Sequence, residues 1–174
     1  MRRDERDTRE FSAFYTDSFE GARRMAYALC GNWVEAEEIA QASLVKVFTH
    51  WSSVRADGEK AYLRTVLART FLDTKRRRRA REHAVAEVHD QPVLGGFADV
   101  DERHQLRSAL WRVPPRQRAV LVLRFVQDLT IEQAAETLGC SIGTVKSQTA
   151  HGLDKLRVAY REVAVEQARV TARS

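Results

Sequence analysis

The sequence predicts an all-helical protein made of two small helical domains joined by a flexible acidic linker. Apolar residues recur at helical spacing through most of the chain, and the strict alternation of half-buried strands is absent. The three prolines and eight glycines fall mainly at junctions between the periodic segments. With 174 residues, the chain is long enough for one larger domain or two small helical ones.

The first domain is predicted at residues 9–82 and contains three helices. The first helix begins near Arg9 and ends at Gly31-Asn32, a pair that suits a left-handed C-terminal cap. The second helix covers about 34–51, and a loop rich in turn-forming residues follows at 52–58. The third helix covers about 59–82.

Apolar spacing gives the second and third helices a buried side and an exposed side. The stripe predicted to be buried in the second helix consists of Ala36, Ile39, Ala40, Val47 and Trp51. In the third helix it consists of Leu63, Val66, Leu67, Thr70 and Phe71. The third helix is expected to expose Arg64, Thr65, Ala68, Arg69, Leu72 and Arg76.

The linker is predicted at residues 83–103, where Pro92 and Gly95-Gly96 disfavour a helix. Residues 1–81 hold 17 Lys and Arg against 12 Asp and Glu, residues 82–103 hold 1 against 6, and residues 104–174 hold 11 against 6. Basic blocks favour a polyanion through counterion release, and an acidic connector is repelled by it. Three solvated surfaces without a partner would show the same charge pattern.

The second domain is predicted at residues 104–162, followed by a short charged tail at 163–174. Its first helix, 104–111, ends before Pro114-Pro115. The next helix, 116–127, has Pro115 at its first turn, where the missing N–H has no intrahelical partner to lose. Its dense Val and Leu residues indicate that it is part of the core.

Residues 130–156 have the pattern of a helix-turn-helix. Thr130 and Gln133 have the spacing of a capping box for a helix at 131–138, Gly139-Cys140 makes the turn, and Ser141 caps the next helix. At about 100° per residue, the inner face of that helix consists of Ile142, Val145, Thr149, Leu153 and Leu156. Short polar side chains suited to base edges occupy the outer face and its flanks: Thr144, Lys146, Ser147, Gln148, His151 and Asp154. An ordinary helical hairpin would have the same spacing.

Two surfaces of the first domain are candidates for binding. The exposed side of the second helix is acidic around Val45, which suits a basic protein partner and disfavours DNA; a solvated helix with one stray valine is the alternative. The third helix ends in the basic run 75–79, which exceeds what the helix dipole requires and favours phosphate contact. The adjacent Trp51, Arg55, Lys60 and Tyr62 combine aromatic and cationic groups, as sites for unpaired bases do. For Trp51, packing in the core is the alternative.

Several classes of protein are disfavoured. No window of about 18 apolar residues could span a membrane, and the charged residues 1–6 do not resemble a secretion signal, so we expect a cytoplasmic protein. Cys30 and Cys140 belong to no CxxC or Cys/His cluster, so we expect no disulfide, metal or cofactor. The chain also lacks a glycine-rich phosphate loop and a nucleophile–base pair, and we expect that it is not an enzyme.

The stretches 112–124, around Pro114-Pro115, and 134–147 resemble the C-terminal domain of bacterial sigma-70 family factors. Residues 35–41 with Phe48 resemble the core-polymerase-binding helix of sigma region 2, and residues 61–79 resemble the helix that meets the promoter −10 element. The two-domain size is similar to that of the extracytoplasmic-function (ECF) group. The resemblance implies a region 2 bundle and a region 4 helix-turn-helix.

The resemblance also implies roles for the matching residues. Contacts to the clamp coiled coil of the largest polymerase subunit would come from Glu35, Glu38, Gln41, Val45 and Phe48. Contacts to the −10 strand, including a flipped base held by the loop 52–60, would come from Arg55, Lys60, Tyr62, Arg64, Arg69, Lys75, Arg76 and Arg77. Contacts to the −35 duplex would come from Ser141, Thr144, Lys146, Ser147, Gln148 and His151. The implied partners are the clamp and flap regions of core RNA polymerase, promoter DNA and an anti-sigma factor.

Four positions depart from the family pattern. Ala42 stands where Glu is common, Arg69 lies near a frequent Asn, and Gln148 and His151 occupy positions where Arg is frequent. Two fewer permanent cations should weaken phosphate binding by the recognition helix. The alternatives are a free-standing transcriptional regulator and an enzyme acting on nucleic acid. A sigma factor needs the acidic face of the second helix to bind polymerase, whereas a free-standing regulator does not.

Overall fold

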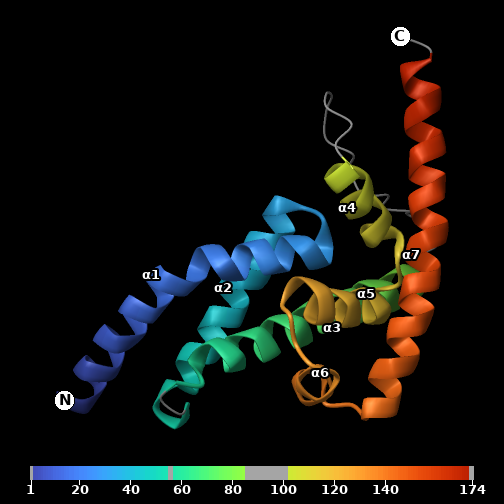
Figure 1. Ribbon diagram of the computed structural model, residues 1–174. Coiled ribbons are helices and arrows are strands. Elements are labelled where there is room, and N and C mark those ends of the chain that lie inside the picture. The colour runs from blue at the N-terminus through green and yellow to red at the C-terminus, as the bar shows by residue number, and fades with distance from the viewer. Residues whose placement is uncertain (1, 55–56, 85–101, 173–174) are drawn as a thin grey trace. The chain divides into compact units, whose positions relative to one another are not determined.

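A computed structural model describes residues 2–54, 57–84 and 102–172, which fall into two compact units, Met1–Arg81 and Glu82–Ser174 (Figure 1). All regular structure within these described ranges is helical, which confirms the predicted fold class. None of the described helices is both long and apolar enough to cross a membrane. Residues 85–101 of the predicted linker lie outside the described residues. The remaining linker residues, 83–84 and 102–103, belong to helices.

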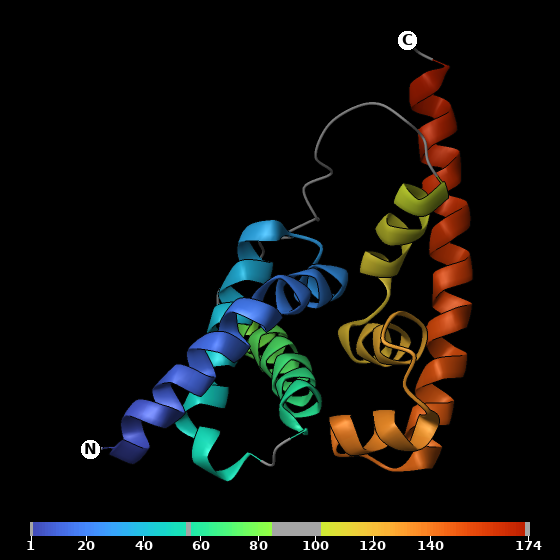
Figure 2. The same ribbon diagram turned by 60° about the vertical axis from the view of Figure 1, so that its left-hand side comes forward.

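The first unit contains α1 (Arg2–Cys30), α2 (Trp33–Thr49), the short 3-10 helix η1 (Trp51–Ser53) and α3 (Glu59–Ala84). Figures 1 and 2 show α2 packed along α1, and side-chain bonds join α2 to α3. Gly31 takes the predicted left-handed conformation at φ 79°. Asn32 instead begins α2, where its side chain accepts hydrogen bonds from the N–H groups of Val34 and Glu35 at 2.8 and 3.0 Å.

Two boundaries in the first unit differ from the prediction. α1 begins at Arg2 rather than near Arg9, and α2 ends at Thr49 rather than at Trp51. Aromatic packing accounts for the second difference, because the Phe11 ring lies 4.8 Å from Phe48 and 5.2 Å from Trp51. These contacts hold Trp51 in a separate turn after α2 has ended.

The core of the first unit forms around Leu29, Leu44, Val47, Leu67 and Phe71, each at most 2% exposed. The predicted buried stripes are confirmed for α2, except that Trp51 is only half-buried, and for all five residues of α3. Ala68 was wrongly expected on the exposed side of α3 and is fully buried. A methyl group is small enough to lie inside a helix interface at the edge of an apolar stripe.

The second unit contains α4 (Glu102–Arg112), α5 (Pro115–Leu121), the π-helix η2 (Val122–Val126), α6 (Ile131–Leu138) and α7 (Ile142–Thr171). Figure 2 shows α4 running beside the long α7, and α5 and α6 also pack against α7. Pro115 lies at the first turn of α5, as predicted. The predicted single helix 116–127 passes into the π turn, where the Gln127 N–H donates to the Val122 carbonyl at 3.0 Å.

The signals predicted for the helix-turn-helix are confirmed. The Thr130 hydroxyl accepts from the Gln133 N–H at 3.1 Å, and the Gln133 side chain accepts from the Thr130 N–H at 2.9 Å. Gly139 is left-handed at φ 63°, and the Ser141 hydroxyl accepts from the Thr144 N–H at 3.0 Å. These local contacts fix where α6 ends and α7 begins.

α7 differs from the prediction at both of its ends. Ile142, expected on the inner face, is 44% exposed, because it precedes the turn in which Val145 is fully buried. The segment predicted as a tail, 163–174, is helical through Thr171. Val163 is buried in a cluster with Ala109 and Ala159, and Arg112 of α4 bonds Glu166 at 3.1 and 2.6 Å. Packing on α4 therefore extends the helix beyond the helix-turn-helix.

Candidate nucleic-acid and protein interfaces

The first turns of α7 present a polar, accessible surface. Ser141, Thr144, Lys146, Ser147 and His151 are exposed, and Gln148 is half-buried. The Ser141 and Thr144 hydroxyl oxygens lie 2.9 Å apart, and the Ser147 hydroxyl donates to the Thr144 carbonyl at 3.0 Å. A hydroxyl engaged in one hydrogen bond retains further bonding capacity, so this surface can contact both base edges and phosphates.

The opposite side of α7 is held firmly against the rest of the second unit. A Cβ placed on Gly152 would lie 3.2 Å from the Leu121 side chain and 3.3 Å from the Gln117 Cβ. The absence of a side chain therefore allows α7 to pass close to α5. Val145 is fully buried one turn after the cap at Ser141. Together these contacts give the polar surface a rigid support.

Lys146 has an acidic neighbour on α6. A hydrogen bond to its own backbone N–H, in the capped first turn of α6, lowers the pKa of Glu132; the Thr130 hydroxyl and the charges of Lys146 and Arg124 add to this effect. Arg124 also donates a hydrogen bond to the Leu129 carbonyl, which braces the turn before α6. The Glu132 carboxylate thus lowers the positive potential at Lys146.

The exposed side of α2 combines apolar and acidic residues. Glu38, Gln41 and Ala42 are exposed, and Val45 and Phe48 are 62% and 46% exposed. The Gln41 amide donates to the Glu37 carboxylate at 3.2 Å. Such a surface can bind a protein with complementary cations and apolar side chains.

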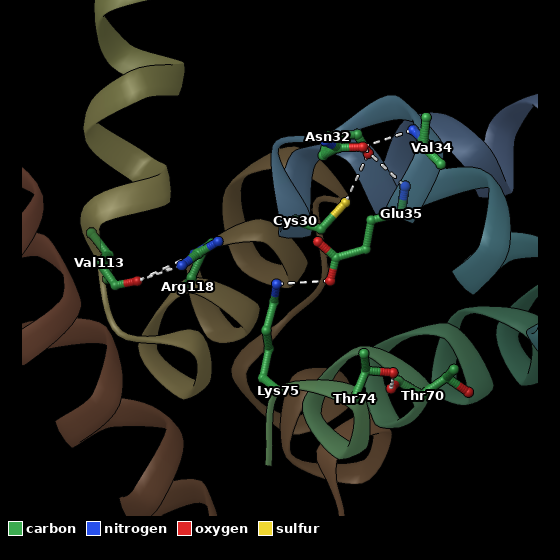
Figure 3. A network of polar contacts seen from close by, with 9 residues as sticks. All are labelled: Cys30, Asn32, Val34, Glu35, Thr70, Thr74, Lys75, Val113 and Arg118. Carbon is green, nitrogen blue, oxygen red and sulfur yellow. Dashed lines mark hydrogen bonds and ion pairs between the residues drawn. The ribbon is translucent and has the colours of Figure 1, made fainter. Parts of the chain in front are cut away.

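Glu35 and Lys75 were expected at two different interfaces and instead contact each other. The Lys75 ammonium donates to the Glu35 carboxylate at 2.7 Å, and the two side chains are 19% and 22% exposed (Figure 3). The ring of Phe71 lies 5.8 Å from the Lys75 ammonium. The pair therefore ties α2 to α3.

Figure 3 shows neighbouring contacts that hold the same region. The Cys30 thiol donates to the Asn32 carbonyl at 3.2 Å, beside the cap of α2. Further along, the Lys46 ammonium donates to the Thr70 hydroxyl at 2.9 Å, which is a second bond between α2 and α3. Both helices are thus fixed relative to one another within the first unit.

The residues expected to contact the −10 strand differ in how exposed they are and in whether they form ion pairs. Arg69 and Arg77 are exposed, whereas Tyr62 and Arg64 are half-buried. Arg76 pairs with Asp73 at 3.1 Å on the same helix, and Lys60 pairs with Asp17 at 2.9 Å. The hydrogen bond to Asp17 raises the pKa of Lys60. Arg55 lies outside the described residues.

Two further observations concern the residues expected to contact the −10 strand. Trp51 lies 5.0 Å from Phe14 and 5.2 Å from Phe11, ring centre to ring centre, so its ring packs against the aromatic residues of α1. The Arg64 Nε is buried and has no hydrogen-bond partner within the described part of the chain. A buried guanidinium nitrogen without a partner is costly, and an incoming acceptor would relieve that cost.

Sequence reasoning missed Val34, which is 69% exposed on α2. Helical spacing could have predicted this exposure, because Val34 lies four residues before Glu38 and therefore on the same side of the helix. It also missed Phe125 and Val126, exposed at 56% and 53% at the end of the π-helix. The π turn shifts the helical register, and apolar spacing does not reveal that shift.

Comparison with known proteins identifies the two units. Residues 18–81 match the family Sigma-70 region 2, and residues 109–158 match Sigma-70, region 4. An RNA polymerase sigma-E factor of Streptomyces avermitilis is 31% identical over 150 residues, which cover 85% of this chain and 83% of that protein.

One further relative agrees with this assignment, and one solved structure shows the same fold. The ECF RNA polymerase sigma factor SigE of Mycolicibacterium smegmatis is 32% identical over 141 residues, covering 77% of this chain but only 55% of that longer protein. Among solved structures, the sigma factor RpoE of Bartonella quintana, crystallised with the anti-sigma factor NepR, has the same fold. It matches with a TM-score of 0.67 and 24% identity over 87% of this chain and 97% of that chain.

Proposed function

The chain belongs to the ECF group of sigma-70 family RNA polymerase sigma factors, and we propose that it uses three separate surfaces to direct core polymerase to promoters. A sigma factor of this family binds core RNA polymerase and promoter DNA, and it is a transcription initiation factor rather than an enzyme. The observation that carries the proposal is the presence, in one chain, of an acidic exposed face on α2 and a capped polar recognition surface on α7.

The first proposed surface reads the −35 element in the major groove. It consists of Ser141, Thr144, Lys146, Ser147, Gln148 and His151 at the start of α7. Exposure of the short polar side chains and burial of Val145 behind them support this assignment. Lys146 is the permanent cation of this surface, so it would supply the main phosphate contact.

The second proposed surface captures the −10 strand after the duplex opens. It consists of Arg55, Lys60, Tyr62, Arg64, Arg69, Arg76 and Arg77. Holding unstacked bases costs a few kcal/mol, which cationic contacts to the strand would offset. Lys75 would act through Glu35, by keeping the start of the basic run against α2.

The third proposed surface binds the clamp coiled coil of the largest polymerase subunit through Glu38, Gln41, Val45 and Phe48. Glu35 would support this face by holding Lys75 rather than by touching the partner. The second unit would contact the flap region. We assign region 2 to residues 9–82 and region 4 to 104–162, with α7 continuing through Thr171.

Regulation by an anti-sigma factor follows by analogy with RpoE of Bartonella quintana, which was crystallised with such a partner. A regulator that covers α2 would block polymerase without touching the DNA-reading residues of α7. Because the polymerase partner acts on the chromosome, the proposed site of action is the cytoplasm.

Run-off transcription tests the proposal. Purified chain and core polymerase are incubated with a library of promoter templates, and the expected result is transcription from a subset that neither component transcribes alone. Val45→Asp should abolish binding to core polymerase while circular dichroism shows an intact fold, because Val45 is exposed. A free-standing regulator would bind DNA without core polymerase and would direct no transcripts, and that outcome would refute the assignment.

A further inference from the structure

The N-terminal half of α1 contacts both ends of the loop 52–60, which is expected to hold a flipped base. At one end, the Phe14 ring lies 5.0 Å from the ring of Trp51, the residue before the loop. At the other end, the Asp17 carboxylate lies 2.9 Å from the ammonium of Lys60. Phe14 and Asp17 are three residues apart and are therefore neighbours on one side of α1. We call these two residues the α1 brace.

The contact with Trp51 also fixes the residues that follow it, because they form a tight turn. The His50 carbonyl accepts hydrogen bonds from the N–H groups of Ser53 and Val54 at 2.9 and 3.2 Å. It also accepts one from the Ser53 hydroxyl at 2.8 Å. Whatever holds the Trp51 ring therefore also sets where Ser53 and Val54 lie.

The contact with Lys60 acts at the first turn of α3. The Lys60 and Asp17 side chains are 73% and 65% exposed, and an ion pair this exposed adds little to the stability of the fold. It does restrict a long, flexible side chain to the direction of α1. An ammonium group has three N–H donors, so Lys60 bonded to Asp17 keeps donors for a phosphate of the strand.

Neither residue of the α1 brace lies in the part of the chain that matches the Sigma-70 region 2 family, because that match begins at residue 18. A carboxylate beside a strand-binding surface repels phosphates by its charge. Asp17 can therefore favour strand binding only through what it does to Lys60.

We infer that the α1 brace positions the loop that captures the −10 strand, with Phe14 fixing the Trp51 end and Asp17 fixing the Lys60 end. This rests on the proposed function, in which Lys60, Tyr62 and the arginines of α3 hold the strand. The brace residues are positioning residues that act through Trp51 and Lys60. A loop that is held before the strand arrives loses less conformational freedom on binding, so the brace raises the affinity for the strand.

Binding of a single strand by the holoenzyme tests Asp17. The probe is a labelled oligonucleotide with the −10 region of a template that is transcribed in the run-off assay. Asp17→Ala should bind it about 3- to 5-fold more weakly than the wild type, the range of a strong exposed ion pair. Without a brace, removal of the carboxylate would relieve repulsion and tighten binding, so tighter or unchanged binding would overturn the inference. Asp17→Glu keeps a carboxylate within reach of Lys60 and should bind like the wild type.

Glu20→Ala is the matched control for the loss of a carboxylate. Glu20 is also exposed on α1, but it pairs with Arg23 and Arg24 of the same helix, so this variant should bind the strand within twofold of the wild type. A double-mutant cycle shows whether Asp17 acts through Lys60. Lys60→Ala should bind equally weakly with and without Asp17→Ala, and a further loss in the double variant would contradict the assigned role.

Phe14 tests the other end of the loop. Phe14→Leu keeps an apolar side chain but loses the ring contact with Trp51, and it should bind the strand about 3- to 10-fold more weakly. Phe14→Tyr keeps the ring and should bind like the wild type. Phe11 is less suitable, because its ring also lies 4.8 Å from Phe48 of the proposed polymerase-binding face. Wild-type binding by Phe14→Leu would show that Phe14 does not position the loop.

Two further measurements separate the brace from the proposed function. Asp17→Ala should compete for core polymerase like the wild type and should melt normally by circular dichroism, because Asp17 is exposed and alanine favours a helix. A loss of polymerase binding in this variant would indicate a general structural role and would overturn the inference. Arg69→Gln and Arg77→Gln should weaken strand binding. If they do so while the brace variants do not, the inference is wrong but the strand-binding surface stands; if neither arginine variant weakens binding, the proposed surface itself is wrong.

Discussion

Arg112 joins the end of α4 to the last turns of α7 through two hydrogen bonds to Glu166, at 3.1 and 2.6 Å. The hydrogen bond to Arg112 lowers the pKa of the Glu166 carboxyl. A carboxyl with a lowered pKa in the folded chain stabilises the fold above its unfolded pKa and loses that contribution as the pH falls through the folded pKa. The stabilisation should therefore be present at neutral pH and disappear in acid.

We expect Glu166→Gln to lower the melting temperature at pH 7, and the difference from the wild type to vanish as the pH falls below about 4. The pair is partly exposed, so the loss should be at most about 1 kcal/mol. Asp154→Asn is the control, because Asp154 pairs with Arg157 within α7 and does not link two helices. A constant difference between wild type and Glu166→Gln from pH 7 to pH 3 would contradict the assigned role.

The Glu35–Lys75 pair leads to a second prediction at the level of residues. Both side chains are largely buried, so removing one partner should cost about 1–3 kcal/mol, between the values for exposed and fully buried pairs. Lys75→Met and Glu35→Gln should each lower the urea midpoint of the first unit, and the double variant should lose less than the sum. Additive losses in the double-mutant cycle would show that the two charges are not coupled.

The helices show which elements can be predicted from sequence. The capping box at Thr130, the left-handed Gly139 and the Ser141 cap depend on neighbouring residues, and all three were predicted correctly. The continuation of α7 to Thr171 depends on packing against α4, which local signals do not encode. The candidate site residues also divide into those set by local sequence and those set by tertiary packing. Helical spacing correctly places Val45 and Lys146 on exposed faces. It cannot reveal that Glu35 and Lys75, 40 residues apart, pair with each other.

Gly152 and Gly21 give two contrasting predictions at the level of elements. A side chain at Gly152 would meet Leu121 and Gln117, whereas nothing lies within 4 Å of a Cβ at Gly21 in the interior of α1. Gly152→Val should destabilise the second unit by about 1–3 kcal/mol through overpacking. Gly21→Ala should stabilise the first unit by up to about 1 kcal/mol, because alanine favours the helix. Urea unfolding measures both, and a neutral Gly152→Val would mean that α7 does not need its close approach to α5.

At the scale of the whole molecule, two net-basic segments flank a net-acidic one. Residues 1–81 hold 17 Lys and Arg against 12 Asp and Glu, residues 82–103 hold 1 against 6, and residues 104–174 hold 11 against 6. In the proposed function, each basic block contains one DNA-binding surface, and the acidic segment is kept off the DNA by its charge. Two weak surfaces on one chain would together bind a promoter tightly, because the second contact would form at a high effective concentration.

The salt dependence of promoter binding shows whether the two proposed DNA-binding surfaces contact one promoter at the same time or only one at a time. Removing one cation that neutralises a phosphate should reduce the slope of log K against log salt by about 0.9 for duplex and about 0.7 for a single strand. Lys146→Gln, on the proposed duplex-reading surface, and Arg77→Gln, on the proposed strand-binding surface, should therefore each flatten the slope measured with the holoenzyme. Both side chains are exposed, so the fold should be unaffected. If both surfaces hold one promoter at once, the double variant should show the sum of the two reductions; a reduction no larger than that of one single variant would show that the two surfaces bind in alternation.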